Sequence, residues 1–103
     1  MGWKIEENFE TTNEVESEVS KPLMFKVILL NDDFTTKDFV VEVLMSFFHK
    51  KEDEAYTLME TVHRKGSAVA GIYSYDIAST LVALVIKKSR ENGFPLRCEM
   101  ECA

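Results

Sequence analysis

Hydrophobic and polar residues follow three distinct strand-like patterns along the chain. Residues 25–30 form a short apolar run, Phe-Lys-Val-Ile-Leu-Leu, that stops at the polar cluster Asn-Asp-Asp at 31–33. This is typical of a largely buried strand that enters a loop. Residues 68–73 form a second run, in which Gly71 indicates a bulge or a close approach of two backbones. Apolar and polar residues then alternate over 96–102, as in a strand with one buried face. The chain is therefore expected to contain three strands.

Between these strands, apolar residues recur every three or four positions, which predicts three helices. The first is capped by Thr35 or Thr36, the second runs from Asp53 or a neighbour to Gly66, and the third begins after Ser74. Their apolar stripes consist of Phe39, Val40, Val43, Leu44 and Phe47; of Ala55, Leu58, Met59 and Val62; and of Ile77, Ala78, Leu81, Val82 and Val85.

The predicted order of elements is β-α-α-β-α-β, which favours an α+β fold. A small antiparallel three-stranded sheet packed against three helices is the natural way to bury these apolar faces. We assign this core domain to residues 22–103. Residues 1–21 differ, because they contain six glutamates against two lysines and only scattered apolar groups. Such a composition cannot offset the entropy of ordering, so we expect a flexible acidic tail.

Composition narrows the classes of partner. A chain of 103 residues and 11.8 kDa is one ordinary domain, and its net charge of -6 argues against binding to nucleic acid or to an anionic membrane surface. No apolar run approaches the roughly 18 to 20 residues of a membrane span. Cys98 and Cys102 lie too far apart on an extended strand for a disulfide or a shared metal site, so we expect two free thiols. We therefore expect a cytoplasmic monomer without metal or cofactor.

Three features outside the core pattern are candidates for chemistry: the polar cluster at 31–33, His63, and the neighbouring apolar pair Met59 and Val62. One helical face carries Met59, Val62 and His63, since Val62 and His63 follow Met59 by three and four residues. A histidine beside apolar residues is most often a core residue, and an Asn-Asp-Asp sequence is most often a turn. No serine stands in a recognisable nucleophile motif. An enzyme is therefore the weaker hypothesis.

Residues 24–103 resemble the ClpS family, the bacterial adaptors that deliver substrates of the N-end rule to a Clp-type AAA+ unfoldase and its protease. The matching segments are Phe-Lys-Val-Ile-Leu-Leu-Asn-Asp-Asp-Phe-Thr at 25–35, Leu-Met-Glu-Thr-Val-His at 58–63, residues 66–73, and Asn-Gly-Phe-Pro-Leu at 92–96. Several independent motifs thus occur in the family's order over one small domain.

The resemblance implies a site for the free N-terminus of a protein. In the family's pattern, Asn31 and His63 bind the α-ammonium group directly, and Asp32 contributes negative charge and a contact through water. These groups would be acceptors for a cation with three donors. A pocket suited to a first residue Leu, Phe, Tyr or Trp would be lined by Leu29, Leu30, Thr35, Lys37, Val40, Met59, Val62 and Leu96. The resemblance implies substrate binding and no catalysis.

Two positions depart from the family's pattern. Lys37 stands where the family usually has a methionine that restricts β-branched residues at the pocket entrance. The unfoldase contact implied by the resemblance is formed by Asp76, Thr80 and Leu81, where the family usually has glutamate at the first position and lysine at the last. The acidic tail would engage the unfoldase pore. The competing hypothesis is a non-catalytic interaction domain of the same fold, such as one resembling the ribosomal stalk C-terminal domain, without a site for an amine.

Overall fold

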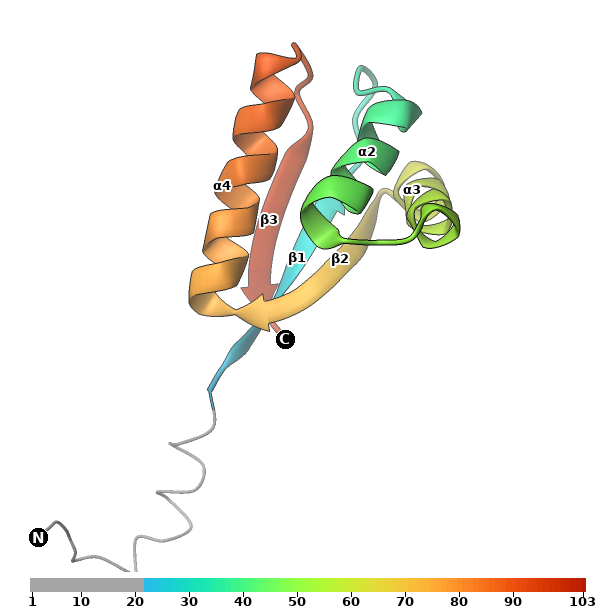
Figure 1. Ribbon diagram of the computed structural model, residues 1–103. Coiled ribbons are helices and arrows are strands. Elements are labelled where there is room, and N and C mark those ends of the chain that lie inside the picture. The colour runs from blue at the N-terminus through green and yellow to red at the C-terminus, as the bar shows by residue number, and fades with distance from the viewer. Residues whose placement is uncertain (1–21) are drawn as a thin grey trace, which may run out of the picture.

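The computed structural model describes residues 22–103, so the predicted tail at residues 1–21 lies outside the described residues. The elements follow one another as β1 (Met24–Leu30), α2 (Lys37–Phe48), α3 (Glu52–Lys65), β2 (Ser67–Ser74), α4 (Tyr75–Glu91) and β3 (Arg97–Cys102). This is the predicted β-α-α-β-α-β order, and the three helices and three strands confirm the α+β fold (Figure 1).

The sheet is antiparallel, with strand order β2-β1-β3 and β1 in the centre. Its register shifts between Val27 and Ile28, which pair with Gly71 and Val69, so that Ala70 is the extra residue of a bulge. A Cβ atom at Gly71 would lie only 2.6 Å from ring atoms of Tyr73. The predicted bulge therefore lies at Ala70, next to Gly71. The group that approaches Gly71 closely is the side chain of Tyr73 and not another backbone.

The helix ends follow local rules. The Thr36 hydroxyl accepts a hydrogen bond of 3.1 Å from the backbone N–H of Phe39 and so caps α2. The helix α3 ends at Gly66, whose φ of 94° is in the left-handed region that favours glycine, and whose N–H donates to the carbonyl of Val62. Local sequence thus sets the two helix ends that border the loop after β1.

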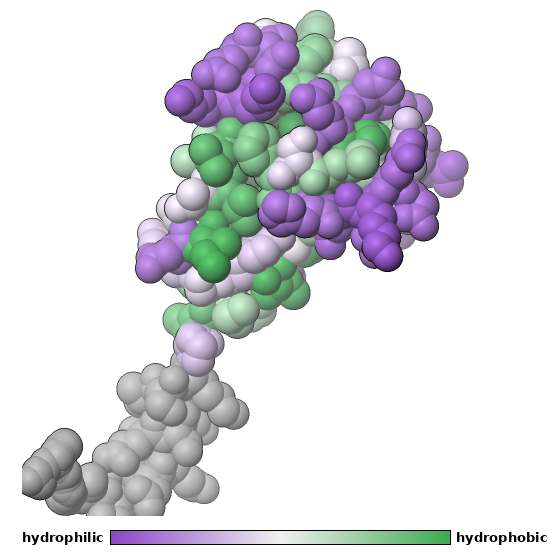
Figure 2. Space-filling model, in the orientation of Figure 1, coloured by the Kyte–Doolittle hydropathy of each residue, from purple (hydrophilic) through white to green (hydrophobic). Residues whose placement is uncertain are grey.

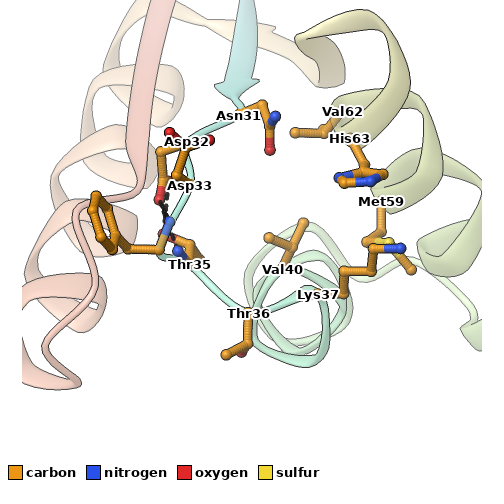
Figure 3. A pocket seen from close by; sticks show the side chains of 11 residues that line it. Asn31, Asp32, Asp33, Thr35, Thr36, Lys37, Val40, Met59, Val62 and His63 are labelled. Carbon is orange, nitrogen blue, oxygen red and sulfur yellow. Dashed lines mark hydrogen bonds between the residues drawn. The ribbon is translucent and has the colours of Figure 1, made fainter.

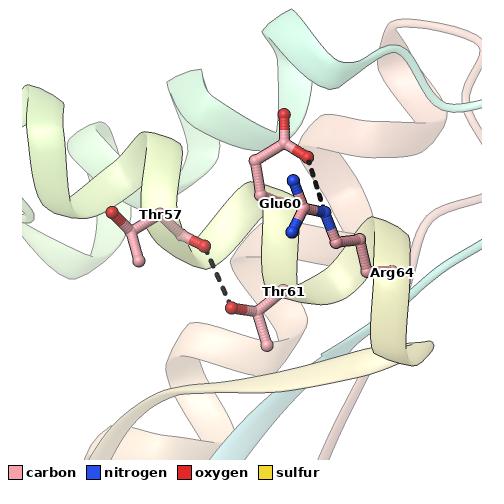
Figure 4. A network of polar contacts seen from close by, with 4 residues as sticks. All are labelled: Thr57, Glu60, Thr61 and Arg64. Carbon is pink, nitrogen blue, oxygen red and sulfur yellow. Dashed lines mark hydrogen bonds and ion pairs between the residues drawn. The ribbon is translucent and has the colours of Figure 1, made fainter.

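The outer face of α3 carries exposed polar contacts (Figure 4). The Thr61 hydroxyl donates to the carbonyl of Thr57 at 3.0 Å, and Arg64 Nε lies 3.7 Å from a Glu60 carboxylate oxygen. An exposed pair at this helical spacing contributes only about 0.3 to 0.5 kcal/mol. The position of α3 is therefore determined by its buried face, on which Ala55, Met59 and Val62 lie.

The core lies between the sheet and the helices. Val27 and Leu29 of β1 are fully buried, as are Val43 and Leu44 of α2 and Val85 of α4. On α4 the buried stripe differs from the prediction, because Ile77 is 52% exposed. Ala78 and Val85, which also belong to the predicted stripe, are fully buried. Figure 2 shows hydrophobic residues along the lower part of the α4 side, and hydrophilic residues at the upper end of that side and over α3.

Candidate functional site

A cavity of about 420 Å³ opens between the loop after β1, the first turn of α2 and the last turns of α3 (Figure 3). Its lining is polar on the side of the loop and largely apolar where the two helices meet. The lining residues are Asn31, Asp32, Asp33, Phe34, Thr35, Thr36, Lys37, Val40, Met59, Val62 and His63.

The loop that forms one wall is held by the Asp32 carboxylate. One carboxylate oxygen accepts from the backbone N–H groups of Phe34 and Thr35 at 2.8 and 2.7 Å, and the other accepts from the Thr35 hydroxyl at 2.7 Å. Asp32 therefore organises the loop as well as facing the cavity.

The same contacts set the charge state of this carboxylate. Partial burial opposes ionisation of Asp32, but the hydrogen bonds from the Thr35 hydroxyl and from two backbone N–H groups favour it, as does the positive charge of Arg97. Together, the contributions that favour ionisation are larger than the effect of burial, so the pKa of Asp32 lies below its ordinary value. The cavity wall therefore carries a fixed negative charge at neutral pH.

Asn31 joins the loop to α3. Its backbone N–H donates to the carbonyl of Gly66 at 2.9 Å, immediately beyond the last turn of α3. That last turn carries His63, which is exposed. In Figure 3 the amide of Asn31 and the imidazole of His63 border the same open space, although 31 residues separate them in the sequence. An amide and an imidazole, both able to accept hydrogen bonds, are thus brought beside the Asp32 carboxylate.

The apolar part of the cavity is formed by residues that also belong to the core. Val40, Met59 and Val62 are 5%, 4% and 2% exposed, respectively. Met59 and Val62 lie three residues apart on α3, and Val40 faces them from α2. Lys37, the first residue of α2, is exposed at the edge of this wall. An apolar side chain that enters here meets buried methyl groups and a thioether, with a lysine at the entrance.

This arrangement suits one kind of ligand. An ammonium group carries three donors and a positive charge, for which Asn31, His63 and Asp32 supply acceptors and a compensating negative charge. An apolar group attached next to that ammonium would lie against the Met59 side of the cavity, away from water. The combination fits a primary amine with a hydrophobic substituent better than it fits an anion.

Eight of the residues assigned to the site from the sequence line this cavity: Asn31, Asp32, Thr35, Lys37, Val40, Met59, Val62 and His63. Three assigned to the pocket do not line it. Leu29 and Leu96 are fully buried in the core, and Leu30 lies half-buried on β1. Leu29 points inward because alternate residues of β1 face the helices, and its inward side is completely covered.

Phe34 and Thr36 also line the cavity, although the sequence pattern does not indicate them as site residues. The sequence indicates Thr36 only as a possible helix cap. Phe34 is a large hydrophobic residue that is 75% exposed in a loop of polar residues, and this isolation is the signal that would have drawn attention to it.

The residues assigned to an unfoldase contact lie on a different element. Asp76 and Thr80 are exposed in the first two turns of α4, which contributes no side chain to the cavity. Leu81 is partly buried and packs against the core. Any partner bound through this part of α4 would therefore contact a surface separate from the cavity.

The described residues contain no group of metal ligands and no membrane-spanning helix. Within residues 22–103 no three His, Cys, Asp or Glu side chains are close enough to hold a metal ion, and no helix is long and apolar enough to cross a membrane. Cys98 and Cys102 are both free thiols, as predicted. Burial, with a contribution from the negative charge of Glu99, raises the pKa of Cys98 to about 12.

Several known proteins are similar to this chain in sequence. Residues 20–99 match the family model of the ATP-dependent Clp protease adaptor protein ClpS. The ATP-dependent Clp protease adapter protein ClpS of Wolinella succinogenes is 55% identical over 91% of this chain and 92% of its own length. The corresponding protein of Acetivibrio thermocellus is 53% identical over 85% of this chain and 89% of its own.

A solved structure matches the fold as well. The structure of Agrobacterium tumefaciens ClpS2 bound to L-phenylalaninamide superimposes with a TM-score of 0.78 at 41% identity, over 81% of this chain and 100% of that one. Because the family model and these relatives each cover most of the sequence, the chain belongs to the ClpS family, the adaptor proteins of ATP-dependent Clp proteases.

Proposed function

We propose that this adaptor binds proteins whose free N-terminal residue is Leu, Phe, Tyr or Trp and delivers them to a Clp-type AAA+ unfoldase, without catalysing a reaction. The observation that carries the proposal is the cavity itself, in which Asn31, Asp32 and His63 stand beside the buried wall of Met59 and Val62. Asn31 and His63 accept hydrogen bonds from the α-ammonium group, and Asp32 supplies negative charge.

The ligand of the Agrobacterium relative supports this proposal. L-phenylalaninamide, to which that ClpS2 protein is bound, combines a free α-amino group with an aromatic side chain. The cavity of this chain offers acceptors and an apolar wall for the same two groups. A ligand of this kind represents the first residue of a protein, since its carboxyl end is an amide, as in a peptide bond.

The energies are adequate for selective binding. Burial of a Leu or Phe side chain contributes roughly 1.5 to 3 kcal/mol. Hydrogen bonds to a charged group contribute roughly 1.5 to 3 kcal/mol each. After the cost of association, dissociation constants in the micromolar range or below are expected. Acetylation of the N-terminus removes its positive charge and at least two of its hydrogen-bond donors, so it should lower the affinity strongly.

The test is a titration with peptides that differ only at their first residue and its acetylation, measured by fluorescence anisotropy or calorimetry. Acetylation of a Leu-initiated peptide should weaken binding by at least about 100-fold, the equivalent of two charge-assisted hydrogen bonds. Equal affinity for the free and the acetylated peptide would favour the competing hypothesis of an interaction domain without an amine site.

Delivery is tested separately from binding. We propose that Asp76, Thr80 and Leu81 contact the unfoldase, since the first two are exposed on a helix that does not border the cavity. We also propose that residues 1–21 act in delivery. Removal of residues 2–20 should leave peptide affinity unchanged but stop ATP-dependent degradation of a Leu-initiated reporter. A truncated protein that supports full degradation would exclude this role.

A further inference from the structure

A second cavity, of about 520 Å³, lies at the turn between α4 and β3. It is lined by Phe34, Arg90, Gly93, Phe94 and Pro95. Phe34 also lines the cavity of the candidate amine site, so the two cavities share a wall. The second cavity therefore lies next to the first, with Phe34 of the loop after β1 bordering both.

The walls of this second cavity are aromatic and held in place. The rings of Phe94 and Phe39 pack with their centroids 4.8 Å apart, and Phe39 is a buried core residue, so Phe94 is supported from below. Phe34, by contrast, is 75% exposed and has apolar surface available for a ligand. An aromatic or branched aliphatic side chain would contact both rings.

Arg90 gives this cavity a positive charge. One of its terminal nitrogens, Nη1, donates to the carbonyls of Phe94 and Leu96, each at 2.9 Å, which fixes the guanidinium beside the turn. The ion pairs within residues 22–103, Lys26 with Glu101 and Arg64 with Glu60, do not involve Arg90. Its other guanidinium donors can therefore bind a carboxylate of a ligand, and its charge would repel a lysine or arginine.

The reach of a peptide indicates which residue would occupy this cavity. In an extended chain, side chains one and three point to the same face, and their Cα atoms lie roughly 7 Å apart. If the first side chain enters the amine site, the second side chain faces solvent and the third faces the protein again. An extended segment that runs past Phe34 would therefore bring its third side chain to the second cavity.

We infer that the cavity at the α4–β3 turn is a second subsite, which rests on the proposed function and selects the third residue of the bound N-terminus. It takes an aromatic or large aliphatic side chain on Phe34 and Phe94, and Arg90 favours acidic over basic residues there. This adaptor therefore distinguishes among substrates that share the same first residue.

The test uses peptides of the form Leu-Gly-X, followed by an invariant Gly-Ser-rich tail with a fluorophore, in which X is Ala, Phe, Glu or Lys. With the full-length protein, X as Phe should bind about fivefold more tightly than X as Ala, and X as Glu about fivefold more tightly than X as Lys. The Arg90→Gln variant should bring the Glu-to-Lys ratio close to one. Lys51→Gln is the matched control, because it removes one positive charge at the exposed N-cap of α3 and should leave the ratio unchanged.

The result for X as Phe relative to Ala provides a second measurement that does not require the Arg90 variant to fold. Affinities that are indifferent to X, with tight binding of all the Leu-initiated peptides, would overturn the subsite and leave the proposed function standing. Binding that survives acetylation of the first residue, or no binding of any Leu-initiated peptide, would overturn the proposed function and the subsite with it.

Discussion

The two sides of the candidate amine site differ in how they are supported. The polar side, formed by Asn31, Asp32 and His63, is partly or largely exposed and is held by local backbone contacts and one bond to the end of α3. The apolar side, which includes Met59 and Val62, is almost fully buried and belongs to the core. Residues of the polar side can therefore be substituted without loss of the fold. The apolar side, by contrast, both lines the cavity and packs in the core.

This difference separates binding from stability in a measurable way. Substitutions of Asn31 and His63 should affect the recognition of the ammonium group and leave the stability nearly unchanged. Asp32 differs from them, because its carboxylate also holds the loop after β1. Substitutions on the apolar side should change both the affinity for hydrophobic first residues and the free energy of unfolding, since the same atoms pack against the core.

The largest effect is expected for Met59→Ala. Truncation of a buried methionine costs roughly 2 to 5 kcal/mol of unfolding free energy, and here it also enlarges the cavity that holds the first side chain. Chemical denaturation and peptide titration measure the two losses. Met45→Ala is the matched control, because Met45 is 40% exposed on α2 and its truncation should cost much less. Equal destabilisation by the two variants would break the distinction between the two sides.

The next largest effect is a loss of peptide affinity in Asn31→Ala and in His63→Ala. Each should weaken binding of a Leu-initiated peptide by about 100-fold or more while the melting temperature stays close to that of the wild type, since each removes an acceptor from the ammonium group. His49→Asn is the control for histidine removal. His49 has a φ of 57°, and asparagine tolerates this left-handed conformation. Unfolding of the His63 variant would instead show that this residue serves the core.

Asp32→Asn should have a smaller effect on binding, on the order of tenfold, because the charge acts through water and through the loop. Its effect on acid stability has a defined sign. The pKa of Asp32 is lowered in the folded state, so its contribution to stability is present above the ordinary carboxyl range and is lost as the pH falls through the folded-state pKa.

Denaturation measured between pH 7 and pH 3 should therefore show a weaker pH dependence in Asp32→Asn than in the wild type. Glu42→Gln, which removes a charge from the exposed side of α2, is the control. Because the pKa of folded Asp32 lies below the ordinary carboxyl value, the wild type should keep this charge to a lower pH than an unpaired carboxyl group would. The same loss of stability at low pH in the wild type and in Asp32→Asn would contradict the assigned hydrogen bonds.

The smallest effect is expected at Lys37, on the boundary between the two sides. A lysine can lay its methylene groups along an apolar wall, but its ammonium resists burial, so it should close the entrance less tightly than methionine. Lys37→Met should sharpen discrimination of Leu over Ile and Val by about 1 kcal/mol, the scale of a one-methylene difference. Lys87→Met, on the exposed side of α4, should leave these affinity ratios unchanged. The same ratios in all three proteins would show that position 37 does not gate the site.

The sequence by itself determined the order and type of the elements. The caps at Thr36 and Gly66 and most of the helical stripes depend on residues close together in the chain, so local rules were sufficient for them. Sequence motifs also led to Asn31 and His63. Their proximity, however, follows from a long-range bond, from the backbone of Asn31 to that of Gly66, which no local pattern specifies.

Only the tertiary structure decided which apolar residues line the cavity and which lie behind it. Leu29, Leu96 and Val62 are all apolar residues next to site motifs, and all are buried to a similar degree. Val62 nevertheless lines the cavity, because the end of α3 lies over the loop after β1, whereas Leu29 and Leu96 are enclosed between the sheet and the helices. The shared wall at Phe34 has the same origin. It depends on a turn some 60 residues away, so the packing of distant elements, and not local preference, creates it.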